Sequence, residues 1–297
     1  MSALLGIIAA GIAFLSWGFG DFALQRTIRR IGSLDTLFYV SAFGGIVLLP
    51  FVWKDIPYLF SDYHALELLG FAILVGFISA VLNFESFKRG KLAVIEPVMS
   101  SELVVTALIS IVFIREKVTT SQILLMLIVF MGILLTMIRV VAPRWWWPWG
   151  KRGIIERGVL YAAMGAVVMS LYNVFIGLSS RATNPLITIW FTHLVIAFVV
   201  LLWLTYRGQS SALFQWGMRR WKLILGASAL DTSAWIAYAA AALFLPIAIT
   251  IAITESYVVL AAMLGIFINK ERLARHQVIG GALALVAAIV LAVVSTR

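Results

Sequence analysis

Four ionisable side chains interrupt long apolar stretches of this sequence. Glu102 and Glu255 each lie about midway along such a stretch, and Asp231 and His193 lie within two others. A charged side chain at the centre of a membrane helix costs about 2.5 to 3.5 kcal/mol on insertion scales, so each one needs protonation, a partner or a wet cavity. A buried carboxylate can bind a cationic group of a substrate, or take up a proton that is exchanged for substrate. Interhelical hydrogen bonding for packing alone is the alternative for each group.

Aromatic side chains accompany these groups. Trp17, Tyr172, Trp235 and Tyr257 lie deeper than the interfacial belt in which Trp and Tyr usually anchor membrane proteins. Asp231 and Trp235 are four residues apart and share a helical face. The rings could form faces for an organic substrate, including cation–π contacts with an amine, or could simply pack. Three further candidates for the same site are Asn173, Trp190 and Tyr238.

Three other polar residues within the apolar stretches have simple structural explanations. Asp21 lies near the end of the first apolar stretch, where solvation by lipid headgroups is sufficient. Asn83 and Glu85 precede Lys88 and Arg89, so a local ion pair of Glu85 is expected.

The elements that must position these residues are transmembrane helices. Hydrophobic residues make up 63% of the 297-residue chain, charged residues 12%, and the mean hydropathy is +1.04. Each crossing of the bilayer needs roughly 20 apolar residues in a helix. We therefore predict an all-α polytopic membrane protein with ten spans, at 2–24, 36–53, 66–87, 92–114, 121–138, 155–178, 185–205, 223–243, 246–268 and 277–294.

The distribution of basic residues predicts the orientation. The formal net charge is +10, and 18 of the 23 Lys and Arg residues fall in the connections that follow the odd-numbered spans. The positive-inside rule places these connections in the cytoplasm and both termini outside it. The basic charge is thus explained by topology in a cell membrane, and no nucleic-acid partner is expected.

An internal repeat relates the two halves of the chain. At an offset of 155 residues Ser101 aligns with Ser256 and Glu116 with Glu271, while Glu102 and Glu255 fall two positions apart. Each half holds five spans, an odd number, so equivalent helices must point in opposite directions as two inverted five-helix repeats. We expect the first repeat at 1–141, an interfacial Trp- and Pro-rich linker at 142–154 and the second repeat at 155–297.

The segments SWGFGDFAL, AVIEPVMSSELVVTALISIVFIREKVTTSQ and AITIAITESYVVLAAMLGIFINKERLARHQ resemble the drug/metabolite transporter superfamily, in its ten-helix EamA-type branch. The resemblance covers essentially the whole chain. It implies the ten-helix fold and a transport function. It also implies cytoplasmic termini, whereas the charge bias of this chain predicts the reverse orientation.

These features favour a secondary transporter that moves a small organic solute by alternating access. We expect export of amino acids or related amine-bearing metabolites in exchange for protons; uniport, solute exchange and uptake are open alternatives. A carrier of nucleotide sugars or other phosphorylated metabolites would need buried Lys or Arg, and almost all basic residues lie in connections. A receptor or structural subunit without transport is the alternative of a different class.

Enzymatic classes are not supported. The sequence has no HExxH, no GxSxG, no phosphate-binding loop and no cysteine. We expect no cofactor and no metal. The expected partners are a small-molecule substrate, the lipid bilayer and protons, and the expected assembly is a monomer or a homodimer.

Overall fold

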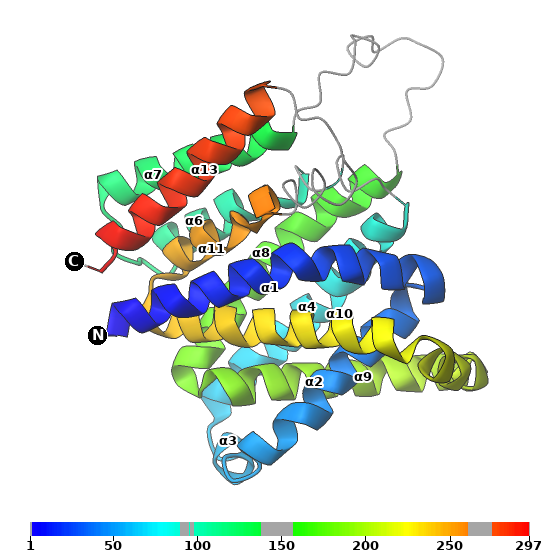
Figure 1. Cartoon of the computed structure of the whole chain (residues 1–297). Helices are drawn as coiled ribbons and strands as arrows, with labels where there is room; N and C mark the ends of the chain where they lie inside the picture. The colour runs from blue at the N-terminus through cyan, green and yellow to red at the C-terminus, as the bar shows by residue number, and fades with distance from the viewer. Residues whose placement is uncertain (1, 90–94, 96–97, 138–156, 261–274, 297) are drawn as a thin grey trace.

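The computed structural model describes residues 2–89, 95, 98–137, 157–260 and 275–296, and within these ranges the chain is helical without strands. The helices pack into one bundle, in which α1 begins and α13 ends on the same side (Figure 1). Their bounds are α1 Ser2–Ile31, α2 Ser33–Val52, α3 Ile56–Leu59, α4 Tyr63–Arg89, α6 Glu102–Val112, α7 Thr120–Met137, α8 Arg157–Ala182, α9 Pro185–Tyr206, α10 Ser210–Phe244, α11 Ile247–Glu255 and α13 Arg275–Val294.

Length and composition make these helices membrane-spanning. Seven described helices are long and apolar enough to cross a bilayer, and three shorter apolar helices accompany them. On α1 the exposed residues Leu4, Ile8 and Ile12 recur every fourth position and form a lipid-facing stripe, while Ala10 and Ala13 on another face are fully buried. A helix satisfies its own backbone hydrogen bonds, which hydrocarbon cannot do. The predicted all-α polytopic membrane fold is confirmed.

Two helix pairs with equivalent positions in the repeat pack in the same antiparallel way. In the pair α1–α10, Gly6 faces Leu245 and Gly20 faces Leu230. In the pair α4–α8, Gly76 faces the ring of Tyr172. The glycines let the helices approach closely, as small residues generally do in membrane bundles.

The remaining pairs join helices that correspond to each other in the two halves. In α2–α9, the Asn184 side chain donates to Asp55 at 3.2 Å, and Gly45 lies against Leu194 further along. In α7–α13, Gln122 near the start of one helix donates to Ser295, which follows the end of the other, at 3.2 Å. In these two pairs each helix thus runs antiparallel to its own counterpart. This arrangement is the inverted repeat that the odd number of spans predicted. The predicted linker at 142–154 lies outside the described residues.

Two predicted spans are interrupted, contrary to the continuous helices expected at 92–114 and 246–268. A turn at Ser100 and Ser101 precedes α6, and a turn at Ser256 follows α11. Ser101 Oγ donates to the carbonyl of Val98, and Ser256 Oγ to that of Ile253, each at 2.6 Å. Serine hydroxyls that bond to nearby backbone carbonyls compete with regular helical geometry. A bond of the same kind therefore accompanies the break in each half.

Two smaller differences from the predicted elements occur in connections. The eighth span is part of the longer helix α10, which begins at Ser210 and bends at Arg220, where the backbone leaves helical geometry. The short helix α3 lies between the second and third spans.

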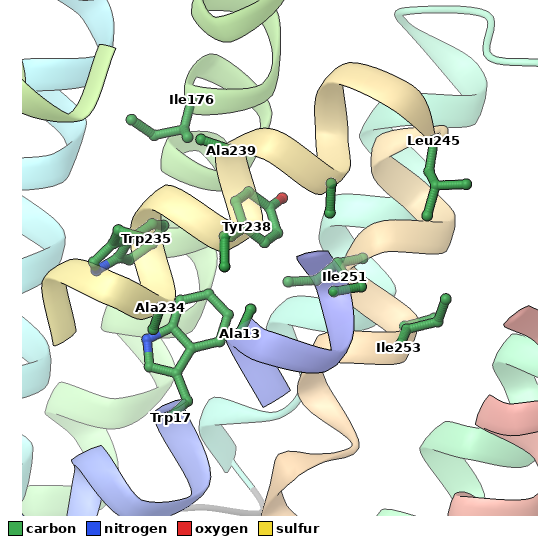
Figure 2. Close-up of a cluster of buried hydrophobic side chains, with 14 of the residues drawn as sticks. Ala13, Trp17, Ile176, Ala234, Trp235, Tyr238, Ala239, Leu245, Ile251 and Ile253 are labelled. Carbon is green, nitrogen blue, oxygen red and sulfur yellow. The ribbon is translucent and has the colours of Figure 1, made fainter. Parts of the chain in front are cut away.

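The core around α1, α10 and α11 consists mainly of small, branched and aromatic side chains. Figure 2 shows Ala13 and Trp17 of α1 against Ala234 and Tyr238 of α10, with Ile251 of α11 nearby. The alanines and Tyr238 in this cluster are fully buried. Close packing of small residues leaves little free space here.

Candidate functional site

The candidate site is a cavity beside this core. Its volume is about 100 Å³, below the roughly 300–1,000 Å³ of pockets for drug-sized ligands, which suits a small solute. Every helix from α1 to α11 except α3 and α7 contributes to its wall. Of the eleven residues predicted for the site, nine line the cavity: Trp17, Glu102, Tyr172, Asn173, His193, Asp231, Trp235, Glu255 and Tyr257.

The other two predicted residues lie outside the lining. Tyr238 is fully buried behind it, where its hydroxyl donates to the carbonyl of Asn173 at 3.3 Å and its ring packs 5.8 Å from that of Trp17. Trp190 packs against Phe191, with ring centroids 6.1 Å apart. Both predictions used depth along the helix, and depth does not specify which face of a helix meets the cavity.

Glu102 and Glu255 meet at the two helix breaks. Glu102 is the first residue of α6, Glu255 is the last of α11, and their carboxyl groups are in hydrogen-bonding contact. Their exposed fractions are only 8% and 4%. Two buried carboxyls in contact cannot both be charged unless a cation lies between them, so the pair holds either a proton or a cation.

Aromatic rings form one wall next to the acids. The rings of Trp17 and Trp235 meet edge to face with centroids 5.1 Å apart, and those of Tyr172 and Trp235 at 4.7 Å. Tyr257 completes the group, 6.2 Å from Trp17. Edge-to-face pairs stabilise each other and fix the ring orientations. The wall can therefore present π faces to a cationic or aromatic group without reorganising.

Comparison with known proteins decides the family. The model of the EamA-like transporter family matches residues 4–138 and 156–293, once for each half of the bundle. The chain belongs to the EamA-like transporter family.

Individual relatives of this EamA-family chain carry little functional detail. A curated protein of Archaeoglobus fulgidus, described as an uncharacterized transporter, is 24% identical over 131 residues. That match spans 44% of this chain and about half, 47%, of the relative. A solved structure described only as the crystal structure of a protein superposes with a TM-score of 0.69 at 15% identity, covering 98% of both chains, and this likeness shows the fold alone.

Asp21 also belongs to the cavity of this EamA-family chain, which the sequence interpretation missed. Its exposed fraction is 8%, it lines the cavity, and its carboxyl is in hydrogen-bonding contact with the Tyr257 side chain. Solvation by headgroups is therefore the wrong explanation. Asp21 lies four residues after Trp17, on the same helical face, and this spacing was the available signal. Asp231 lies close enough to repel Asp21 electrostatically and contacts the Trp235 side chain.

Several polar atoms in the wall are buried without a partner in the part of the chain that the structure describes. They are the amide nitrogen and oxygen of Asn83, the amide nitrogen of Asn173 and Nδ1 of His193. All three side chains are less than 5% exposed. Buried polar groups normally have hydrogen-bond partners, so these atoms are exceptions in the wall of the cavity. Asn83 was also missed, because its neighbour Glu85 suggested a local ion pair. That ion pair is present, with Arg89 Nε 2.7 Å from Glu85.

Tightly packed glycines place two of these groups. A Cβ atom on Gly44 of α2 would overlap the His193 ring, and one on Gly165 of α8 would overlap the Asn83 amide oxygen. Both side chains lie over glycine backbone of a neighbouring helix, which holds them at the cavity wall.

Within the described residues, the cavity extends toward one end of the bundle. Its lining extends to Leu24 near the end of α1 and to Phe87 near the end of α4. At the opposite end Arg181 of α8 forms an ion pair with Glu116 at 2.8 Å and donates to the carbonyls of Ala242 and Leu245 at 2.8 and 2.9 Å. Glu116 also accepts from the backbone of α11, from Ile247 N at 2.9 Å. This pair therefore joins α8, α10, α11 and the end of the fourth span where the cavity is closed.

Proposed function

We propose that this EamA-family chain is a secondary transporter that exports small amine-bearing solutes, amino acids or their relatives, in exchange for protons. The observation that carries the proposal is the contact between Glu102 and Glu255 at two equivalent helix breaks. Broken helices at the interface of inverted repeats are where such carriers bind substrate and coupling ion. A carboxyl pair that holds either a proton or a cation exchanges one for the other.

Alternating access follows from the closed and open ends of the cavity. The cavity lining extends toward the ends of α1 and α4, whose last turns carry Arg29, Arg30, Lys88 and Arg89. By the positive-inside rule, this end lies on the cytoplasmic side of the cell membrane. The structure then corresponds to a state that accepts solute from the cytoplasm, with the Glu116–Arg181 pair closing the outer end. Rocking of one repeat against the other would reverse the two ends.

Nucleotide sugars and other phosphorylated solutes fit the cavity poorly. Its described lining contains no Lys or Arg, whereas phosphate recognition relies on such residues. A phosphate beside four carboxyls would be repelled.

The decisive experiment is transport into proteoliposomes that contain the purified protein, with an imposed proton gradient. Amines, amino acids, organic cations and nucleotide sugars are compared, together with Glu102→Gln and Glu255→Gln. Both variants are expected to lose proton-driven accumulation. Glu67→Gln, at an exposed carboxylate of α4, is the matched control and should transport normally. Normal gradient-driven transport by both cavity variants would refute the two-carboxylate mechanism, and accumulation of nucleotide sugars alone would refute the substrate class.

A further inference from the structure

We infer that the cavity selects solutes with two separated cationic groups, such as linear diamines, over zwitterionic amino acids. The inference rests on the proposed transport function and narrows its substrate class.

The charges of the lining are the first observation. Asp21, Glu102, Asp231 and Glu255 all line the cavity, and no Lys or Arg is among the lining residues that the structure describes. An amino acid would bring its own carboxylate into a site with four carboxyls and no cation to receive it. Burying an unpaired charge is costly, and like charges repel strongly where water is scarce. A solute with positive charge only avoids both penalties.

The spacing of the acids is the second observation. Electrostatic coupling runs from Asp231 to Asp21, from Asp21 to Glu255, and from Glu255 to the contacting Glu102. In the described ranges no three Asp, Glu, His or Cys residues gather closely enough to hold a metal ion. The four carboxyls therefore do not converge on one point, and the contact of Glu102 with Glu255 is distinct from the site of Asp21 and Asp231. This arrangement matches an elongated dication better than a compact metal ion.

The wall between the two pairs suits the body of such a molecule. Trp17 lies one helical turn before Asp21 and packs against Tyr257, which follows Glu255 by two residues. These rings offer an apolar surface for a methylene chain and π faces for its ammonium ends.

The test measures binding and proteoliposome uptake for three matched solutes: a linear diamine, the monoamine lacking the second amino group, and the ω-amino acid in which a carboxylate replaces it. A series of diamine lengths should show an optimum. At that optimum the diamine is expected to bind about tenfold or more tightly than the monoamine, a difference of about 1.4 kcal/mol, with the amino acid weakest.

Single substitutions distinguish the roles of the two carboxyl pairs. Asp231→Asn should abolish the advantage of the diamine over the monoamine, because it removes the carboxylate that would receive the second ammonium group. Glu255→Gln should weaken the binding of both solutes. Asp231→Glu keeps a carboxylate at this position and should retain the preference for the diamine. A loss of preference in Asp231→Asn alone could then not be explained by a folding defect. A preference for the amino acid, or equal affinity for monoamine and diamine, would overturn the inference while leaving proton-coupled amine export intact. Uptake of none of the three solutes would refute both proposals.

Discussion

Ser101 and Ser256 make the same hydrogen bond in the two halves of the protein. Each hydroxyl donates at 2.6 Å to the carbonyl three residues earlier, that of Val98 or of Ile253. Each bond accompanies the helix break beside which Glu102 or Glu255 enters the cavity. The two carboxyls therefore meet beside two breaks with the same local hydrogen bond.

Removing these hydroxyls should impair transport more than stability. In Ser101→Ala and Ser256→Ala the backbone loses the competing bond, so regular helix is favoured and the neighbouring carboxyl is displaced. We expect uptake to fall about tenfold, since displacements of about 1 Å at a site can cost even more. Uptake is measured in proteoliposomes and thermal unfolding in detergent. Ser61→Ala removes the same kind of bond, to Tyr58, in an exposed connection and should leave uptake unchanged. Equal loss in all three variants would contradict the prediction.

The Glu116–Arg181 pair should hold the outer end closed. Arg181→Ala leaves Glu116, whose side chain is 7% exposed, without its cation. Breaking a buried pair costs about 3–5 kcal/mol, and we expect less here, about 2 kcal/mol, because the Arg181 side chain is 31% exposed. The native chain has no cysteine, so Ile176→Cys in the closed core gives a clean probe.

An impermeant thiol reagent applied from the outer side should label Ile176→Cys faster when Arg181→Ala is also present. Arg89→Ala is the control, since Arg89 pairs with Glu85 at the other end of the bundle. Unchanged labelling in the Arg181→Ala protein would show that the pair does not close the cavity.

The α7–α13 contact should tolerate no added methyl group. A Cβ atom on Gly132 would lie 2.6 Å from the backbone nitrogen of Ala284 and 2.7 Å from the carbonyl oxygen of Gly280. Backbone atoms cannot yield as a flexible side chain can, so Gly132→Ala should destabilise the protein by about 1–3 kcal/mol. Gly70→Ala, where nothing lies within 4 Å, should be neutral or slightly stabilising. Thermal unfolding in detergent distinguishes them, and equal melting temperatures would count against the packing.

Orientation can be measured in whole cells. If the termini lie outside, Ser2→Cys reacts with an impermeant thiol reagent in intact cells, whereas Gly208→Cys, between α9 and α10, reacts only after permeabilisation. The absence of native cysteine removes background labelling. The reverse pattern would place the termini in the cytoplasm, as the family resemblance implies, and would turn the open end of the cavity outward.

The sequence was sufficient for the fold because apolar length and the 155-residue repeat are properties of the chain alone. The sequence was less informative about which face of each helix meets the cavity. Trp190 was chosen as an aromatic residue inside a span, one turn from His193, yet only His193 lines the cavity, since residues three positions apart on a crowded helix can meet different neighbours. Asp21 and Asn83 were set aside because their positions near helix ends have simple explanations. Only the packing of α1 and α4 against α10 and α8 shows that these ends line a cavity.

The alanine contact between α1 and α10 also bears on how fast the outer end can open. Ala10, Ala13, Ala234 and Ala241 offer no directional bonds and almost no rotamer freedom to lose or regain. Such surfaces can separate and pack together again without leaving a polar group unpaired in hydrocarbon. Among the described residues, the polar contacts that oppose opening at this end are those of Glu116 and Arg181, so we expect turnover to depend strongly on these two side chains.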